Sequence, residues 1–492
     1  MDLKIIKKDY LPKLSWLTEI NKNNNNINLY CGPWVEADKN FFVEGAWDGD
    51  FNDINFDSSV VFMGSGGIVK NDYIKFVTPC NTVEALYSCK QGDTYYFSNS
   101  IPFLLEITNE ELDFNYLDYE NDFLSISDGI NSYIDKVPLN SSNDIEVHYF
   151  KNIIVDKNLK VTKQNKPTPP NFKNYDDYYS FLITKLKHID HNFRSKNRVK
   201  TYGPIVFSSN GYDSAACAAL GREIECNTAI VYESKKARED TGKPIVKKLG
   251  YETIIEKEEL DYLKMNNTED FVSNGELGTS IFFSSSEPYL EGTYILSGIH
   301  GDWVWDKHAK PNEEILRSFY PDTARKEFRL RVGFHFVTIP FFAVQSHFDL
   351  YRISNSKEME PWSIGNDYDR PIARRILEDQ GIPRDMFGIA KDGGAGSSLR
   401  FLNLTYLKRV MPKKCYEDFR EYYKKNKNKR KRNLKYLMRS IRYSLYILKV
   451  ILQQKKIIQS FKDTERKYTC SPWAPSFLFF WGVEKVRKRY EI

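Results

Sequence analysis

The sequence predicts an α/β protein in which a doubly wound, mostly parallel sheet is preceded by a mainly β region and followed by a helical tail. Three observations lead to this prediction. Residues 1 to about 150 contain short runs rich in β-branched and aromatic residues, and strand-like and helix-like patterns alternate between residues 203 and 296. From Lys413 onward the chain is basic, aromatic and helical in pattern. Alternating strands and helices with tight turns between them are typical of a parallel sheet covered by helices.

The N-terminal region, residues 1–160, is expected to form a β-rich domain. Its candidate strands are Val60–Met63, Thr94–Ser98 and Val147–Ile154. The sequence Gly-Ser-Gly-Gly at Gly64–Gly67 indicates a hairpin. Lys163–Pro170 (KQNKPTPP) has the composition of a linker.

The second region, residues 171–410, begins with an amphipathic helical pattern over Tyr175–Phe193. Short apolar runs and small-residue helical patterns then alternate. Strands are expected at Gly203–Ser208, Thr228–Tyr232, Glu252–Glu256 and Thr293–Leu296, and helices at Asp213–Leu220 and Lys243–Leu249. Ligands of such sheets bind at the carboxyl ends of the strands. Residues 411–492 are expected to form a helical extension.

Charge and cysteine usage exclude several classes of protein. The net charge of +5 is small for 492 residues, although Lys424–Lys435 holds eight basic residues and no acidic one. No apolar run approaches the roughly 18–20 residues that span a bilayer, and the N-terminus lacks the apolar core of a signal peptide. Seven scattered cysteines without a Cys-x-x-Cys pair are typical of reduced thiols. We therefore expect a cytoplasmic protein without disulfides or structural zinc.

The most informative segment is Ile205–Cys217, where an apolar strand leads into a polar turn and directly into a helix. The turn, Ser209-Asn-Gly-Tyr-Asp-Ser214, offers backbone N–H groups and hydroxyls to an anion. The start of the helix adds a partial positive charge of about half a unit. The turn matches neither Gly-x-x-x-x-Gly-Lys-Ser nor Gly-x-Gly-x-x-Gly, which disfavours kinase-like phosphate loops and dinucleotide folds. A turn that only caps a helix would have a similar sequence.

This turn resembles the Ser-Gly-Gly-x-Asp-Ser signature of the PP-loop ATP pyrophosphatases, with Asn210 in place of one glycine. Later segments, in matching order, resemble the asparagine synthetase family within that group. They are Leu296–Asp302 (LSGIHGD), Pro340–Ala343 (PFFA), the arginine-rich stretch that starts at Asp369 (DRPIARRIL), Gly381–Arg384 (GIPR) and the loop that starts at Lys391 (KDGGAGSS). The resemblance extends over about 200 residues.

The resemblance implies an enzyme that uses ATP and Mg²⁺ to activate a carboxylate as its acyl adenylate. Asp213 and Asp302 are the Mg²⁺-ligand candidates, because Mg²⁺ is usually held by one or two carboxylates plus phosphate oxygens. Lys391 would neutralise charge at the α-phosphate or at the attacked carbonyl, and Asp213 and His300 are the other catalytic candidates. Val231 and Tyr232 are adenine contacts by position, and Glu239 and Asp240 stand where the family often has an acidic residue. The full set of expected ATP- and pyrophosphate-binding residues is Ser209, Asn210, Gly211, Tyr212, Asp213, Ser214, Val231, Tyr232, Ser297 and Gly298.

The sequence also departs from the family pattern. Ile299 stands where asparagine synthetases have Glu and β-lactam synthetases have Tyr, and Trp303 replaces the second acidic residue of that loop. Ala343 replaces the final Asp of Pro-Phe-Leu-Asp. No general base stands at its expected place, and the adjacent His300 is a substitute candidate whose alternative is a purely structural role. Glu327 is a candidate second carboxylate behind the site.

Two N-terminal segments, Trp47–Phe51 (WDGDF) and Phe97–Phe103 (FSNSIPF), faintly resemble the glutamine-amidotransferase half of the family. Glutaminase activity there needs a cysteine whose own α-amino group acts as base. The sequence begins Met1-Asp2, and its first cysteine is Cys31. We therefore expect a degenerate glutaminase domain, as in β-lactam synthetases.

The leading hypothesis is an AMP-forming amide ligase that joins a small-molecule or sugar carboxylate to ammonia or an amine. Intramolecular amide closure, nucleoside or tRNA modification, and a non-catalytic nucleotide-binding relative remain alternatives. Lys424–Lys435 is either a solvated face or a contact for an anionic partner, such as a membrane surface or nucleic acid. A homo-oligomer is compatible with all of these.

Overall fold

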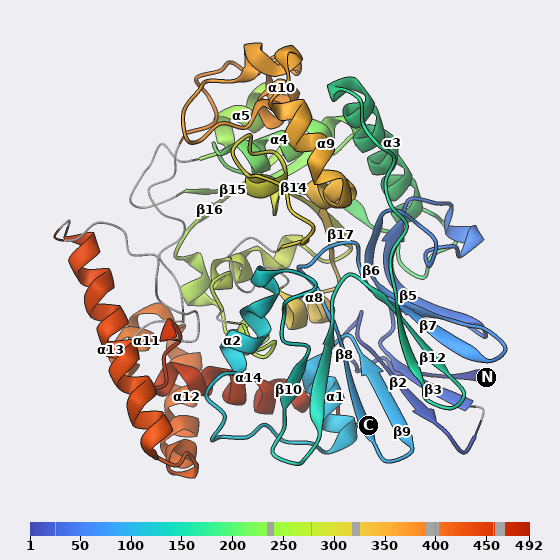
Figure 1. Cartoon of the computed structure of the whole chain (residues 1–492), viewed down its shortest axis with the longest axis vertical. Helices are drawn as coiled ribbons and strands as arrows, with labels where there is room; N and C mark the ends of the chain where they lie inside the picture. The colour runs from blue at the N-terminus through green and yellow to red at the C-terminus, as the bar shows by residue number, and fades with distance from the viewer. Residues whose placement is uncertain are drawn as a thin grey trace.

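The computed structural model describes residues 1–24, 26–233, 241–276, 278–316, 325–389, 399, 403–455, 457 and 468–492. It contains three sheets, of seven, six and five strands. The first two belong to the N-terminal half and the third to the middle of the chain (Figure 1). Among the described residues, no helix is both long and apolar enough to cross a membrane.

The seven-stranded sheet has the order β1-β3-β2-β9-β8-β11-β10. Its strands are β1 (Asp2–Lys7), β2 (Trp16–Asn21), β3 (Asn26–Cys31), β8 (Leu86–Gln91), β9 (Thr94–Ser98), β10 (Lys136–Pro138) and β11 (Asp144–His148). The six-stranded sheet has the order β13-β12-β7-β6-β5-β4. Its strands are β4 (Glu36–Asp38), β5 (Phe41–Trp47), β6 (Phe62–Val69), β7 (Tyr73–Val77), β12 (Asn152–Asp156) and β13 (Val161–Gln164). The mainly β character predicted for this region is confirmed.

Aromatic side chains fill the space between these two sheets. Phe76 and Phe97 stack with ring centroids 4.1 Å apart, and Trp16 meets Phe42 edge-on at 4.8 Å. All four side chains are buried, and they come from strands of both sheets. Alternation along each strand therefore points one set of residues into a shared core, as in a β-sandwich.

Two local expectations for this region are wrong. Gly64–Gly67 is not a hairpin but the middle of β6, paired with β5. A Cβ on Gly66 would stand 2.3 Å from the carbonyl oxygen of Phe42, so glycine is used there for close strand approach rather than for a turn. Val147–Ile154 is not one strand, because the chain leaves β11 and enters β12 of the other sheet, with Phe150 at φ 60° between them.

The segment expected to be a linker is partly docked. Lys163 belongs to β13, and Lys166 is buried with its ammonium donating to the Thr78 carbonyl at 2.6 Å and to Asn152 Oδ1 at 2.8 Å. Burial lowers the pKa of Lys166 to about 7. Composition alone suggests a free linker, but long-range hydrogen bonds fix this one.

The five-stranded sheet is entirely parallel and has the order β16-β15-β14-β17-β18. Its strands are β14 (Gly203–Ser208), β15 (Thr228–Glu233), β16 (Thr253–Glu258), β17 (Thr293–Ser297) and β18 (His335–Thr338). The chain builds outward from β14 to β16 and then returns to place β17 on the other side of β14. The strand order therefore reverses between β14 and β17, which is where ligands of such sheets bind. The predicted parallel sheet is confirmed, and β18 is an additional, fully buried strand.

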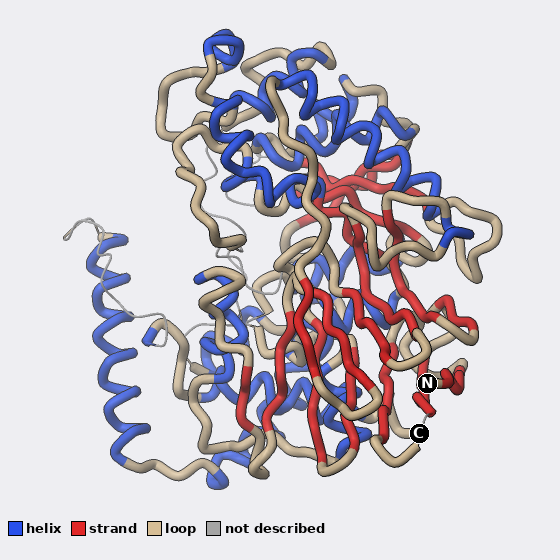
Figure 2. The backbone as a smooth tube through the Cα atoms, turned by 45° about the vertical axis from the view of Figure 1, so that its right-hand side comes forward, coloured by secondary structure: helices blue, strands red, loops and turns tan. Residues whose placement is uncertain are grey.

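Helices above this sheet in Figure 1 include α4, α5, α9 and α10, and the N-terminal sheets lie below it; Figure 2 shows the same separation from another side. The helices of this region are α3 (Tyr175–Phe193), α4 (Tyr212–Gly221), α5 (Lys243–Lys248), α6 (Glu269–Val272), α7 (Gly301–Val304), α8 (Lys326–Val332), α9 (His347–Ser354) and α10 (Pro371–Asp379). The chain also forms the 3₁₀ segments η5 (Ile281–Tyr289) and η6 (Ile339–Ser346).

The C-terminal part is helical, as predicted, and it packs against the rest of the chain. Its helices are α11 (Leu404–Val410), α12 (Lys413–Asn426), α13 (Leu434–Gln454) and α14 (Leu478–Arg487). Helix α14 packs against α6 and against α1 (Ile101–Thr108) of the β-rich region. Arg487 is paired with Glu106 at 2.8 Å, and Tyr490 stacks on Phe103. The end of the chain is thus part of the contact between the two larger regions.

Candidate functional site

The loop after β14 is a compact polar turn. The hydroxyls of Ser209 and Ser214 lie 2.7 Å apart, and the Ser209 N–H donates to Ser214 Oγ at 3.2 Å. The Gly211 N–H donates to Ser209 Oγ at 3.3 Å, and Gly211 is the N-cap of the ten-residue helix α4. Strand, turn and helix start therefore occur as the sequence predicts. Two hydroxyls and the amides of the first helical turn are gathered where an anion would be stabilised.

The loop after β17 packs directly on this turn. A Cβ on Gly298 would lie 2.6 Å from the backbone carbonyl of Asp213, and a Cβ on Gly301 would lie 2.6 Å from Asp213 Oδ1. Ser297 Oγ accepts the N–H of Ile299 at 3.3 Å and shapes the bend. The two glycines permit an approach that a side chain would block. The structure thus brings together Asp213, Ser297 and Gly298, which the sequence suggested for one site.

Two arginines from the segment before and within α10 reach the same place. Arg370 forms an ion pair with Asp213, and Arg374 donates to the hydroxyl of Tyr212. Burial opposes the charge on Arg370, but Asp213, Tyr368 and Asp302 together raise the pKa of this guanidinium above its ordinary value. Neither arginine has a role predicted from the sequence. Their positions, Arg370 as the N-cap of α10 and Arg374 four residues later inside the helix, were the available signal.

Asp302 is half-buried in α7 and close enough for its charge to act on Arg370. Asp213 and Asp302 therefore both border the turn. Two carboxylates near one turn are the kind of donor set that Mg²⁺ uses when phosphate oxygens and water complete its shell. Among the described residues, no cluster of three or more His, Cys, Asp or Glu side chains forms a metal site on its own.

The segment that follows α10 also approaches the polar turn. The N–H groups of Gly388 and Ile389 point to the carbonyl oxygen of Asn210, at 2.8 and 3.4 Å. Gly388 has φ +72°, and a Cβ there would lie 2.5 Å from the Tyr212 ring. Lys391, the predicted catalytic lysine, lies outside the described residues, as do Glu239 and Asp240. The last described residue before Lys391 is thus tied to the polar turn.

His300 is placed differently from what a catalytic base requires. It is 1% exposed, and its ring stacks on Phe341 of η6 with centroids 4.5 Å apart. Neither ring nitrogen has a hydrogen-bond partner among the described residues. Burial, with a smaller contribution from His347, lowers the pKa of His300 to about 3. Its catalytic role stays a prediction, and this geometry favours a packing role.

The proposed adenine contacts lie at the carboxyl end of β15. Val231 is fully buried in the sheet, and its side chain belongs to the core. Tyr232 is half-buried and its hydroxyl lies 2.6 Å from Ser286 Oγ of η5. Burial raises the pKa of Tyr232. At these two positions a ligand would meet the backbone and the Tyr232 ring rather than a free hydroxyl.

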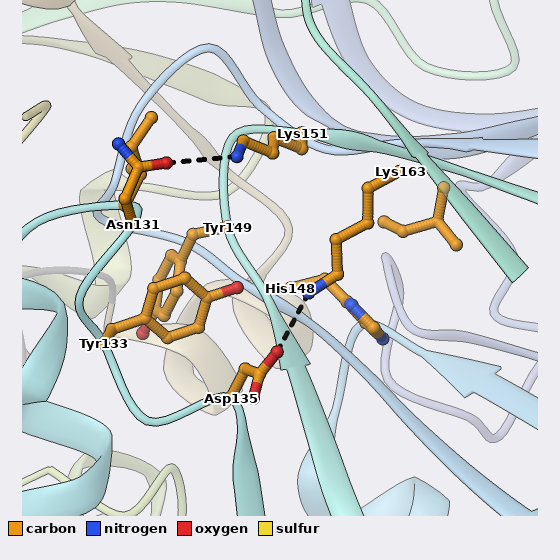
Figure 3. A pocket seen from close by; sticks show the side chains of 9 residues that line it. Asn131, Tyr133, Asp135, His148, Tyr149, Lys151 and Lys163 are labelled. Atoms are coloured by element: carbon orange, nitrogen blue, oxygen red, sulfur yellow. Dashed lines mark hydrogen bonds and ion pairs between the residues drawn. The ribbon is translucent and has the colours of Figure 1, made fainter. Parts of the chain in front are cut away.

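A separate cavity of about 320 Å³ lies in the β-rich region, at β11, β12 and β13. Figure 3 shows Asp135 and Lys163 pointing toward one another, with Lys151 directed at Asn131. The Asp135–Lys163 pair is 2.9 Å long and the Lys151–Asn131 hydrogen bond 3.2 Å. Burial lowers the pKa of the adjacent His148 to about 4. Within this cavity Asp135 neutralises Lys163, and Lys151 is hydrogen-bonded to an uncharged amide oxygen.

Comparison of the chain with models of protein families and with curated proteins found no match in either set.

Proposed function

We propose that the α/β region is a PP-loop ATP pyrophosphatase of the asparagine synthetase type, acting as an AMP-forming amide ligase. The observation that carries the proposal is the packing of Gly298 and Gly301 against Asp213. It joins two loops that each resemble the family at the one point where the order of a parallel sheet reverses. An isolated helix-capping turn would not require the second loop to approach so closely.

The reaction would begin with attack of a substrate carboxylate on the α-phosphorus of ATP, which expels pyrophosphate and forms an acyl adenylate. The hydroxyls of Ser209 and Ser214 and the amides at the start of α4 would hold the departing pyrophosphate. Mg²⁺, held by Asp213 and Asp302 with the nucleotide, would neutralise phosphate charge. Ammonia or an amine then attacks the acyl carbon and releases AMP. Lys391 would stabilise negative charge during these steps.

The nitrogen source in this proposal is ammonia or an amine supplied from outside the β-rich region. Cys31 is the last residue of β3, is fully buried, and burial raises the pKa of its thiol to about 11. A thiol nucleophile must be exposed and easily ionised. Its environment therefore supports a ligase without glutaminase activity at Cys31. The acid would be a small molecule or a sugar carboxylate.

One observation favours a second candidate, a relative that binds nucleotide without turning it over. Arg370 already occupies the carboxylate of Asp213, and the family's acidic positions hold Ile299 and Trp303. An arginine can replace a metal as counter-charge, but it cannot bridge phosphates and carboxylates in the same geometry. The two candidates differ in whether ATP is cleaved.

Acid-dependent exchange of labelled pyrophosphate into ATP tests the proposal. The full chain is incubated with ATP, Mg²⁺ and pools of carboxylic acids without an amine, so that the reaction stops at the adenylate. Exchange that needs one pool and disappears in Asp213→Ala supports the ligase and identifies the acid by subdivision of that pool. ATP binding without exchange across all pools favours the non-catalytic relative. Absence of both exchange and ATP binding contradicts both candidates.

A further inference from the structure

Helix α13 (Leu434–Gln454) presents its apolar side to solvent. The exposed fractions of seven apolar side chains along it lie between 42% and 74%. These residues are Leu434, Leu437, Met438, Ile441, Leu445, Leu448 and Ile451. With about 100° between successive residues, all except Ile451 fall within an arc of about 100° on the helix surface. We call these seven residues the α13 stripe. A helix of a globular protein normally turns such a stripe inward.

The opposite side of α13 fixes this orientation. Tyr443 is fully buried and meets Trp473 edge-on with ring centroids 5.0 Å apart. Arg439 is 7% exposed and lies 2.8 Å from Asp118 of the β-rich region. These contacts lie about half a turn from the stripe, so they hold it outward. Figures 1 and 2 both show α13 at the outer edge of the molecule.

The approach to α13 is anchored as well. Arg430 is 5% exposed and donates to the carbonyl oxygens of Phe114 at 2.7 Å and Pro472 at 3.1 Å. Its guanidinium also lies over the Phe477 ring, 4.3 Å from the centroid. This buried arginine fastens the turn between α12 and α13 to the body of the protein. The stripe is therefore a fixed surface.

Positive charge surrounds the stripe. Residues 422–455 contain twelve Lys and Arg and no Asp or Glu. Three exposed cations at spacings of seven residues, Lys435, Arg442 and Lys449, form a line along one edge of the stripe. Lys424, Lys425, Lys427, Lys429, Lys431 and Arg432 are exposed at its N-terminal end. Lys435 also lies 3.8 Å from Asp118, and positive charge remains in excess over residues 422–455. An apolar stripe bordered by such an excess of cations matches a surface that is apolar inside and anionic at its boundary.

We infer that α13 docks the protein on an anionic phospholipid surface. The helix lies in the plane of the membrane, the α13 stripe enters the boundary between headgroups and acyl chains, and the line of cations contacts lipid phosphates. A second copy of the chain would bring two cationic borders together, and the repulsion between like charges opposes that contact. A nucleic acid would engage the cations but leave the apolar stripe in water. The inference is independent of the proposed ligase, because it needs neither ATP nor the polar turn.

Flotation of the full chain with vesicles tests this inference. Vesicles of phosphatidylcholine with about 30% phosphatidylserine should carry the protein upward. Pure phosphatidylcholine vesicles, or 0.5 M NaCl, should weaken binding by at least about tenfold, because the charge contribution is lost or screened. Equal binding to both kinds of vesicle would overturn the electrostatic half of the inference, and no binding to either would overturn it entirely.

Matched variants separate the stripe from the charges. The triple change Ile441→Gln, Leu445→Gln and Leu448→Gln keeps good helix formers and should weaken vesicle binding by at least about tenfold. The control is Ile134→Gln with Phe348→Gln, which removes two apolar side chains of similar exposure, 46% and 58%, from other surfaces. Lys435→Gln, Arg442→Gln and Lys449→Gln should lose the preference for phosphatidylserine, whereas changes at the exposed Lys70, Lys90 and Lys160 should not. Far-UV circular dichroism verifies that each variant is folded.

A fluorescent probe reports insertion directly. All seven native cysteines are buried, so a thiol-reactive environment-sensitive dye can be attached selectively at Leu445→Cys. Its emission should rise and shift to the blue when phosphatidylserine vesicles are added, and the same dye at Ile134→Cys should not respond. A stripe-dependent dimer without vesicle binding would assign the surface to a second copy instead. Salt-sensitive nucleic-acid binding that survives the stripe changes would assign the cations to that partner and overturn the inference.

Discussion

The guanidinium of Arg370 is paired with the carboxylate of Asp213, so two residues 157 positions apart in sequence share one charge contact at the start of α4. Arg370 is 8% exposed and Asp213 is 21% exposed at the side chain. The pair is therefore partly shielded from solvent, where a charge-assisted contact is stronger than on the surface. In the proposed function, Mg²⁺ and Arg370 compete for the carboxylate of Asp213.

We predict that replacing Asp213 and replacing Arg370 change the half-saturating Mg²⁺ concentration in opposite directions. Asp213→Asn should abolish a metal contact, lower exchange by at least about a hundredfold and raise the half-saturating Mg²⁺ concentration. Arg370→Gln should lower the half-saturating Mg²⁺ concentration for ATP binding by about tenfold, because a competing cation is gone. Titration calorimetry with ATP at varied Mg²⁺ measures both. A fall in Mg²⁺ affinity in Arg370→Gln would mean that the arginine itself binds the phosphates.

A side chain placed between the loop after β14 and the loop after β17 should force the two loops apart. Gly298→Ala places a methyl group 2.6 Å from the Asp213 backbone, which neither side can accommodate without moving. We expect exchange to fall by at least about tenfold, since a misplacement of about 1 Å at a reacting centre can cost a hundredfold. Gly203→Ala, in β14 of the same sheet, is the control, because its Cβ would meet nothing within 4 Å. Equal activity of the two variants would show that the loop contact is dispensable.

Arg329 on α8 should contribute strongly to stability, because it connects the α/β region to two carboxylates of the β-rich region. It donates to both carboxylate oxygens of Glu44, at 2.8 and 3.0 Å, and lies 2.6 Å from Glu84. All three side chains are buried. Arg329→Met leaves two buried carboxylates without this counter-charge and should reduce the free energy of unfolding by about 3–5 kcal/mol. Urea denaturation followed by circular dichroism measures the change.

The control for Arg329 is an ion pair at the surface. Arg384 pairs with Glu378 at 2.8 Å, but its side chain is 51% exposed. Arg384→Met should change the free energy of unfolding by only about 0–1 kcal/mol. Adding Glu44→Gln to Arg329→Met should recover part of the loss. Identical effects of the two arginine changes would argue against a burial-dependent role.

Glu327 predicts a specific pH dependence of stability. Burial raises the pKa of Glu327 from 4.5 to about 7 in the folded protein, where the Tyr490 hydroxyl donates to it at 2.7 Å. Between pH 4.5 and about 7 the folded state holds this proton more tightly than the unfolded state. The contribution of Glu327 to stability is therefore complete below pH 4.5 and is lost as the pH rises through 7.

The change Glu327→Gln should remove this dependence. The free energy of unfolding of the variant minus that of the wild type should increase by about 3 kcal/mol from pH 4.5 to 8. Taking the difference cancels the buried histidines, whose pKa values are lowered and whose contributions run in the opposite direction. Glu360→Gln, at an exposed position, controls for loss of a surface carboxylate. A flat difference curve would mean that Glu327 titrates alike in both states.

Local patterns were sufficient for many elements. The sequence predicts α3 over Tyr175–Phe193, β9 over Thr94–Ser98 and β14 over Gly203–Ser208, and the structure has the same limits. These segments have a clear period of 3.6 residues or a short apolar run between turn residues. The turn Ser209–Ser214 was found for a related reason, because a strand, a glycine-containing turn and a helix follow one another without interruption. Its PP-loop function remains a proposal.

Features that depend on contacts between residues far apart in the sequence were decided only by the tertiary structure. Strand β18 has four residues, all buried, and such a short run has no period to detect. Gly64–Gly67 suggested a turn, but contact with β5 makes it strand. The pairing of Arg370 with Asp213 and the burial of His300 against Phe341 involve residues that no local pattern connects.

Helix α13 separates most clearly what the sequence determines from what packing determines. Its sequence alone determines an amphipathic helix with one apolar side and a strongly cationic border. Only the packing of Tyr443 and Arg439 against the body of the protein decides that this apolar side faces outward. The reason is that periodicity fixes which residues share a face, whereas the neighbours available in three dimensions determine which face is buried.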